Sequence, residues 1–168
     1  MRNPPEFRHA SFEFRHAFLQ KRVPGVRRQT NPALQNLAQL LLTQEAGVDS
    51  STEAMARVCD KLRLHLAKLM GLDGFTLLLV RSLTFARGDF PWLETIQAER
   101  DGSLNGLRPS VQTQEPAELM AGFAAVLAYF FGLLLAFIGG DLTLRLIRGI
   151  WPDNDILSDT CIGVFMVL

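Results

Sequence analysis

Cysteine is scarce in this sequence of 168 residues, which contains only Cys59 and Cys161. A disulfide framework needs several cysteines, and a cysteine-based metal site needs a short spacing such as Cys-x-x-Cys. Neither pattern is present, so we expect reduced thiols in a cytoplasmic protein. The N-terminal residues also lack the apolar core of a secretory signal, which supports the same expectation.

Catalytic motifs are missing as well. There is no glycine-rich phosphate loop, no Gly-x-Ser-x-Gly and no Cys-x-x-Cys. We therefore expect no cofactor and no small-molecule substrate, and we favour a non-enzymatic protein. Only three histidines occur, and we interpret His65 as a hydrogen-bonded histidine in or beside the core rather than as a metal ligand.

The chain has no net charge, but its charged residues are unevenly distributed. Basic and acidic residues number 17 each, yet residues 1–28 contain seven basic and two acidic residues, a net charge of +5. The remaining 140 residues therefore carry −5. A basic segment can bind nucleic acid, anionic lipid or an acidic partner. No nucleic-acid-binding signature accompanies it, so we interpret residues 1–28 as a basic helical arm that docks on the helical body of residues 29–168.

A pentapeptide, Glu-Phe-Arg-His-Ala, occurs at residues 6–10 and again at 13–17. Asn3 and the following prolines predict a helix start, and Pro24 with Gly25 ends the helix near residue 22. Seven residues complete nearly two helical turns, so the repeated side chains stack along the helix. The resulting apolar stripe, which we predict to be a partner-binding surface within the chain or between chains, consists of Phe7, Phe14 and Phe18.

The same repeat supports an alternative, a metal site. Glu-x-x-His is the pattern that di-iron carboxylate bundles use, and His9, Glu13 and His16 on one helix could bind zinc or another transition metal. However, the di-iron pattern places its motifs on different helices, and the rest of the chain contains no further Glu-x-x-His. A metal-binding helical protein is therefore the third function that we consider.

The middle of the chain contains capping signals and apolar spacings of helices. Asn31 and Pro32 predict a helix that ends at Gly47, with an apolar face of Leu34, Leu37 and Leu41. Ser50 predicts a second helix, ending at Gly71, whose apolar face is Met55, Val58, Leu62, Leu66 and Leu69. Residues 75–87 are apolar on nearly all sides, which favours a buried helix over a strand. A short helix from Asp89 to about Ala98 follows, and the turn dipeptides at 101–102 and 105–106 are compatible with a small hairpin.

Residues 119–140 form the longest stretch without a charge. Their length and composition meet the requirement for a transmembrane helix, and Gly132, Ala136 and Gly140 form a small-residue stripe of the kind that pairs membrane helices. The alternative is the central helix of a soluble bundle, apolar on every side because it is surrounded. We favour the bundle, because the basic flank at Arg145 and Arg148 would place the preceding 118 residues outside the cell without a signal sequence.

Helix length gives a further expectation. One helix over 116–150 would be roughly 50 Å long, whereas a domain of this size has a radius of gyration of about 15 Å. We therefore predict a kink or break near Gly139-Gly140, with Asp141 capping the next helix. Residues 161–168 have no polar side chain except a thiol and need the body, a membrane or a partner to cover them.

Together these patterns predict an all-α fold, a single-domain bundle of about six helices around a very hydrophobic central helix at 119–138. The function we favour is a helical interaction or regulatory module that acts through a protein partner or self-association. The alternative is a membrane-anchored protein with a single span at 119–140.

Overall fold

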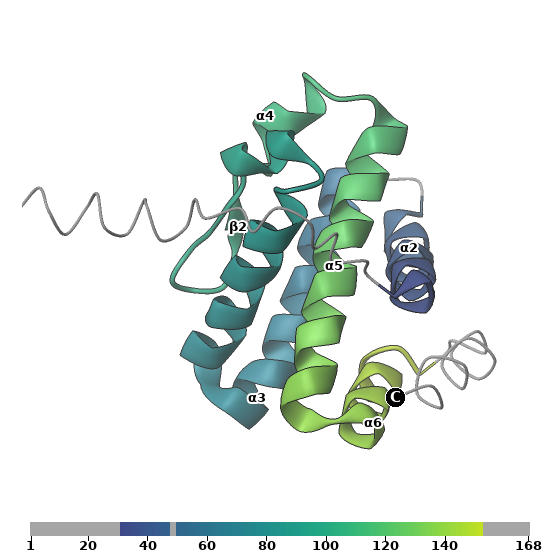
Figure 1. The fold of residues 1–168 in the computed structure, drawn as a ribbon, viewed down its shortest axis with the longest axis vertical. Helices are drawn as coiled ribbons and strands as arrows, with labels where there is room; N and C mark the ends of the chain where they lie inside the picture. The colour runs from purple at the N-terminus through teal and green to yellow at the C-terminus, as the bar shows by residue number, and fades with distance from the viewer. Residues whose placement is uncertain (1–30, 48–49, 153–168) are drawn as a thin grey trace, which may run out of the picture.

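The computed structural model describes residues 31–47 and 50–152, and this part of the chain is mostly helical, as predicted (Figure 1). The predicted arm helix and the apolar segment 161–168 lie outside the described residues. In chain order the elements are α2 (Pro32–Ala46), α3 (Ser51–Ala86), the 3-10 helix η1 (Pro91–Thr95), β1 (Gln97–Ala98), β2 (Leu104–Asn105), α4 (Leu107–Val111), α5 (Pro116–Ile138) and α6 (Gly140–Ile150).

Helices α2 and α3 begin at the predicted caps. The Asn31 side chain accepts a hydrogen bond from the Ala33 N–H at 3.0 Å, and the Ser50 hydroxyl accepts one from the Glu53 N–H at 3.5 Å. Each bond satisfies an N–H group that has no partner within the helix. The predicted apolar face of α2 is buried, so the spacing of its leucines identified the core correctly.

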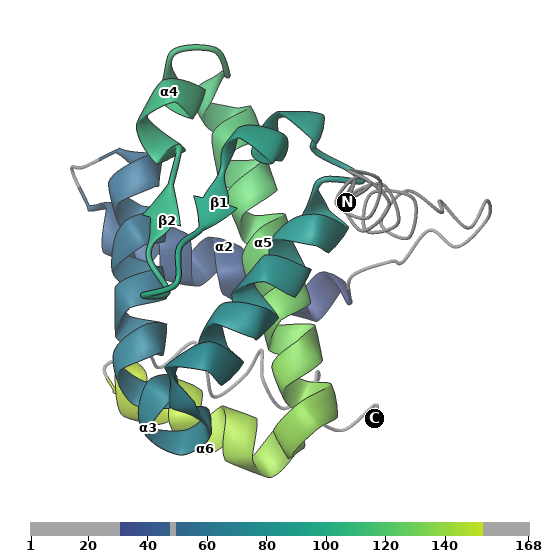
Figure 2. The same ribbon diagram turned by 90° about the vertical axis from the view of Figure 1, so that its left-hand side faces the viewer.

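Helix α3 bends sharply at Gly71, where φ is 78° and ψ is 163°. This backbone conformation is accessible almost only to glycine, so the predicted end of a helix at this residue is confirmed as a break. Residues 51–70 form a first segment and residues 72–86 a second one, and the chain turns back on itself between them (Figure 2). The second segment is helical, as favoured over a strand.

The predicted helix from Asp89 to Ala98 is wrong. Only Pro91–Thr95 is helical, as a 3-10 helix, and Gln97–Ala98 pairs with Leu104–Asn105 in an antiparallel hairpin. The guanidinium of Arg87 explains the early end, because it donates to the carbonyls of Leu93 at 3.3 Å and Ile96 at 2.7 Å. The expected hairpin is present with Asp101-Gly102 in its turn, whereas Asn105 belongs to β2.

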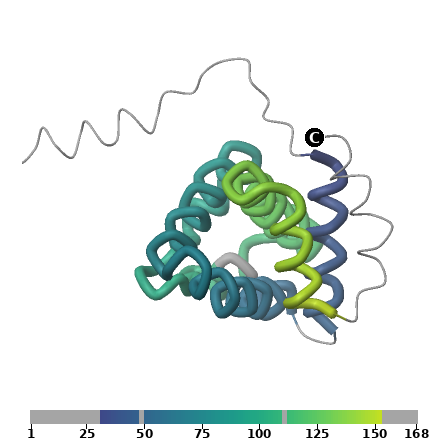
Figure 3. Tube along the Cα trace, turned by 90° about the horizontal axis from the view of Figure 1, so that it is seen from below, coloured from purple at the N-terminus to yellow at the C-terminus, as the bar shows by residue number. Residues whose placement is uncertain are grey.

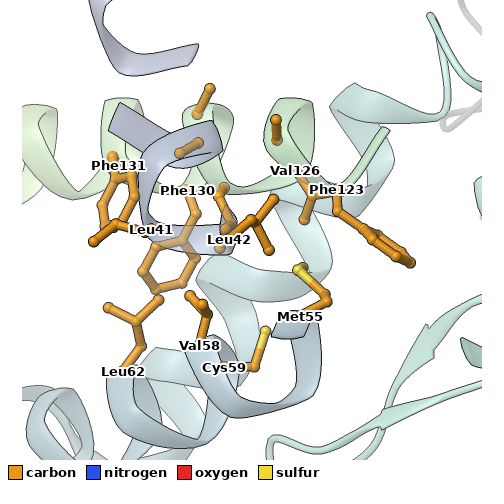
Figure 4. Packing of buried hydrophobic residues seen from close by; sticks show 14 of the residues in the cluster. Leu41, Leu42, Met55, Val58, Cys59, Leu62, Phe123, Val126, Phe130 and Phe131 are labelled. Atoms are coloured by element: carbon orange, nitrogen blue, oxygen red, sulfur yellow. The ribbon is translucent and has the colours of Figure 1, made fainter. Parts of the chain in front are cut away.

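The core lies where α5 packs against α2 and α3 (Figure 4). Phe130 of α5 contacts Phe75 of α3 edge to face, with ring centroids 5.6 Å apart. The buried aromatic and aliphatic residues around them include Leu41, Leu42, Met55, Val58, Leu62, Phe123 and Phe131. One predicted core residue is not buried: Leu69 is 50% exposed, because it lies two residues before the break at Gly71.

The small-residue stripe of α5 does not form a packing face. Gly132 lies beside α2, where a Cβ atom would be 3.6 Å from Leu34 Cδ1, but Ala136 is exposed. The close approach occurs instead at Gly122, where a Cβ atom would lie 2.4 Å from Trp92 Cζ2. The sequence analysis missed this contact because Trp92 is remote in sequence.

The predicted break after α5 is present at Gly139, with φ at 82° and ψ at 168°. Asp141 does not cap α6, because the helix already begins at Gly140 and places Asp141 in its first turn. The Thr143 hydroxyl donates to the Gly139 carbonyl at 2.8 Å. Seen from below, α6 passes beneath the bundle toward α2 (Figure 3).

Candidate interaction surface

Two glycine breaks lie at the same end of the bundle. Gly71 in α3 and Gly139 between α5 and α6 both have positive φ, and both turns are at the lower end of Figure 1. Exposed apolar side chains flank each break. Leu69 and Leu72 are 50% and 40% exposed beside Gly71, and Phe137 and Leu142 are 70% and 40% exposed near Gly139.

Leu72 and Phe137 lie toward the lower end of the helices that carry the buried Phe75 and Phe130. Phe75 and Phe130 are in contact inside the bundle. Leu72 precedes Phe75 by three residues, and Phe137 follows Phe130 by seven residues, which returns it to the same helix face. Because the second segment of α3 and α5 run in opposite directions (Figure 2), both steps lead to the same end. Helix α6 packs against α3 and α5 at this end, but Leu72 and Phe137 remain exposed there.

The outer face of the second α3 segment adds two more residues, Leu77 at 67% exposure and Val80 at 41%. We define the apolar end surface as Leu69, Leu72, Leu77, Val80, Phe137 and Leu142. Their exposed areas, spread over α3, α5 and α6, add up to on the order of 500 Å². Single exposed leucines are ordinary, such as Leu64 on the outer face of α3, whereas contiguous apolar patches of several hundred Å² are typical of interaction sites.

Charge around the apolar end surface is balanced. The exposed ionic residues beside its two breaks are Lys68 and Asp73 near Gly71, and Asp141 and Arg145 near Gly139. Two positive and two negative groups leave no net charge beside the breaks. Charge alone therefore favours a partner of neither sign at this end.

The far end of α6 is fixed to the bundle by a polar cluster. Trp151 donates from Nε1 to Glu45 Oε1 at 2.8 Å, Glu45 pairs with Lys61, and the Lys61 ammonium lies 5.9 Å from the Trp151 ring centroid. Burial raises the pKa of Glu45, but the hydrogen bonds from Lys61 and Trp151 and the nearby positive charges outweigh it and hold the pKa below its ordinary value. This cluster holds α6, and with it Leu142, in place.

The predicted site residues on the N-terminal repeat, Phe7, Phe14 and Phe18 as well as His9, Glu13 and His16, lie outside the described residues. Within 31–47 and 50–152, no group of three or more potential metal ligands is present.

The structure also places His65 and Cys59. His65 is hydrogen-bonded, with Nδ1 2.9 Å from the Lys61 carbonyl oxygen, but it is exposed rather than at the core. Cys59 is buried, and burial raises its pKa to about 12, so its thiol stays protonated and unreactive.

No protein-family model, curated protein or solved structure matches this chain. Function must therefore be argued from the geometry alone. The sequence analysis missed the apolar end surface and assigned Leu69 to a buried helix face. The available signal was a pair of glycines, Gly71 and Gly139, each at the end of an apolar helix. Large apolar side chains lie within three residues of both glycines.

Proposed function

We propose that this protein is a non-enzymatic interaction module, a single-domain bundle built around α5, that binds a protein partner through the apolar end surface. The observation that supports the proposal is a set of six exposed apolar side chains, four of which lie within three residues of the two helix breaks. The module is expected in the cytoplasm.

The size of the surface indicates the kind of partner. A standard protein–protein interface buries about 800 Å² on each side, more than the roughly 500 Å² exposed by these six side chains. A short amphipathic helix buries a few apolar anchors at i, i+3, i+4 and i+7 and needs less area. The surface is therefore suited to a single helical segment of the partner.

The test compares two substitutions of exposed apolar residues. Phe137→Asp places a charge within the apolar end surface. Leu64→Asp places the same charge on the outer face of the first α3 segment, between Lys61 and Lys68. Exposed substitutions change stability little, and circular dichroism checks that both variants fold. After cross-linking in cells, we expect proteins captured by the wild type to be retained by Leu64→Asp and lost with Phe137→Asp. Retention by both variants, or loss from both, contradicts the proposal.

A membrane-anchored protein is the second candidate. Two helices of the described part, α3 and α5, are long and apolar enough to cross a membrane. In the apolar window of α5, however, 61% of the residues are buried against the rest of the chain, compared with 28% in α3. A span at 119–140 would pair through Gly132, so Gly132→Leu should abolish a detergent-resistant dimer that Gly149→Leu retains. That result would favour the span.

A metal-binding function through His9, Glu13 and His16 stays a prediction from the sequence. Metal analysis of the purified protein tests it. Stoichiometric zinc or iron that is lost in the His9→Ala and His16→Ala variants would support it.

A further inference from the structure

We propose that a stripe on the outer face of the second α3 segment pairs, in antiparallel orientation, with the same stripe of a second copy of this chain. The stripe, called the α3 stripe below, consists of Asp73, Leu77, Val80 and Arg81. It shares Leu77 and Val80 with the apolar end surface, but it lies on a single helix and does not include Phe137, on which the test of the proposed function depends. The inference therefore goes beyond the proposed function and can fail separately from it.

The α3 stripe is one continuous face of a helix. Its residues are spaced at i, i+4, i+7 and i+8, which returns each of them to the same side of the helix. All four are exposed, with Leu77 at 67% and Val80 at 41%. The opposite face of this segment is buried and consists of Phe75, Leu79, Ser82, Leu83 and Ala86. The described part of the chain therefore leaves the apolar centre of the α3 stripe uncovered.

Helix α3 is more apolar than its burial in the bundle requires. Its most apolar window is hydrophobic enough to cross a membrane, yet only 28% of that window is buried, compared with 61% in α5. A lipid bilayer does not suit the α3 stripe, because Asp73 and Arg81 lie on its exposed side and a charged side chain is costly in hydrocarbon. A suitable cover must instead provide an apolar centre and one charge of each sign.

A second copy of the α3 stripe provides these groups in the required order. Asp73 and Arg81 lie four residues before and after Leu77, about 6 Å to either side of it along the helix axis. When the second helix runs antiparallel with Leu77 against Leu77, each Asp73 faces the Arg81 of the other copy. A two-fold axis at Leu77 generates both ion pairs at once, as in any isologous dimer. In a parallel pair, by contrast, like charges would face each other.

The ordinary packing of two helices accommodates this register. Asp73, Leu77 and Arg81 lie on one i±4 ridge, and the commonest crossing of two helices, at about −50°, aligns such ridges. Within residues 31–47 and 50–152, neither Asp73 nor Arg81 forms an ion pair. The Arg81 guanidinium carbon lies 5.7 Å from the centroid of the Phe85 ring, a contact that orients the side chain without using a carboxylate.

The α3 stripe is small, so the dimer is weak. Residues 72–86 form a helix about 22 Å long, and one face of it buries less than the about 800 Å² per copy of a standard interface. Exposed ion pairs add little affinity but determine orientation. We therefore expect an equilibrium between monomer and dimer in the micromolar range or weaker, which salt shifts toward the monomer.

Charge reversal tests the register. Asp73→Arg and Arg81→Asp each place two like-charge pairs in the dimer, so sedimentation equilibrium should show dimerisation weakened about tenfold or more in either variant. Mixing the two variants restores both opposite-charge pairs in a heterodimer, whose affinity should return to near that of the wild type. Glu118→Arg, which also reverses an acidic residue in a first helical turn, and Lys68→Asp are the matched controls and should dimerise like the wild type. Circular dichroism checks that every variant folds.

A disulfide measures the same contact without changing the charges. Leu77→Cys in the Cys161→Ser variant places one thiol at the two-fold axis, where the Cα atoms of two packed helices come within about 6 Å. Oxidation by copper phenanthroline should link this variant as a dimer. Leu64→Cys, at a position 60% exposed on the first α3 segment, is the control and should remain mostly unlinked. Buried Cys59 is kept in both variants.

Four results would overturn the inference: a monomer at every concentration, a dimer that tolerates both charge reversals, a mixture of the two variants that forms no heterodimer, or equal cross-linking at residues 77 and 64. If Phe137→Asp abolishes partner capture while the wild type stays monomeric, only the inference fails. If the dimer shows the expected charge dependence but Phe137→Asp captures the same proteins as the wild type, only the proposed function fails.

Discussion

Gly122 and Gly132 lie ten residues apart on α5, and the bundle predicts opposite effects for the same substitution at these two positions. Alanine is favoured over glycine in a helix by about 1 kcal/mol, so the helix alone predicts that both variants are more stable than the wild type. The neighbours differ. At Gly132 the new methyl group would meet Leu34 Cδ1 at 3.6 Å, an ordinary contact, whereas at Gly122 it would meet Trp92 Cζ2 at 2.4 Å.

The indole of Trp92 has little room to move. It packs edge to face on Phe123 with ring centroids 5.6 Å apart, and carbon atoms in contact are normally about 3.5–4.0 Å apart. The ring must therefore shift by more than about 1 Å, and such overpacking costs about 1–3 kcal/mol. Gly122→Ala should lower the free energy of unfolding by about 1 kcal/mol, and Gly132→Ala should raise it by about 0.5–1 kcal/mol.

Urea unfolding followed by circular dichroism measures this difference of about 2 kcal/mol, which corresponds to melting temperatures roughly 4–8 °C apart for a chain of this length. Trp92→Phe in the Gly122→Ala background removes the clashing atom and should recover most of the loss. If Gly122→Ala is as stable as Gly132→Ala, or if Trp92→Phe restores nothing, the packing of η1 against α5 described above is wrong.

Three further predictions concern charge, reactivity and backbone. Because the folded pKa of Glu45 is lowered, its contribution is present above about pH 4.5 and is lost as the pH falls through the folded value. Glu45→Gln should cost about 1 kcal/mol at pH 7 and progressively less in acid, as measured by urea unfolding at each pH. Cys59, with its pKa raised to about 12, should not react with Ellman's reagent at pH 8 in the Cys161→Ser variant until urea unfolds the protein, and rapid labelling of the folded state would contradict its burial. Gly139→Ala should cost about 1–3 kcal/mol, because φ is 82° there, while Gly149→Ala in α6, with open space around it, should gain up to about 1 kcal/mol; equal stabilities would argue against the break.

Local signals in the sequence were sufficient to locate the starts of α2 and α3 and the two glycine breaks. Asn31 and Ser50 identified two helix starts, and Gly71 and Gly139 identified two breaks, because capping and positive φ depend on one or two residues. The helix predicted from Asp89 failed because the Arg87 side chain binds carbonyls six and nine residues further on. A long side chain acting at that distance leaves no periodic pattern to read.

The candidate site was harder to predict for a related reason. Helical spacing placed Leu69 on the same face as Leu62 and Leu66, and that face does point toward the core. Burial, however, ends where the neighbouring helices end, and this depends on where α5 and α3 turn relative to each other. Residue spacing along one helix does not show where the neighbouring helices end. The exposure of Leu69 and Phe137 therefore became visible only in the fold.

Both proposals depend on α5 being a core helix in water rather than a membrane span. The most direct measurement is to express the full chain without detergent, wash the membrane fraction with alkaline carbonate and analyse the supernatant by gel filtration. We predict that the protein is in the supernatant and elutes as a discrete species of defined mass. A protein that remains in the washed membranes and needs detergent for release would contradict the bundle, and α5 would then have to be read as a transmembrane helix.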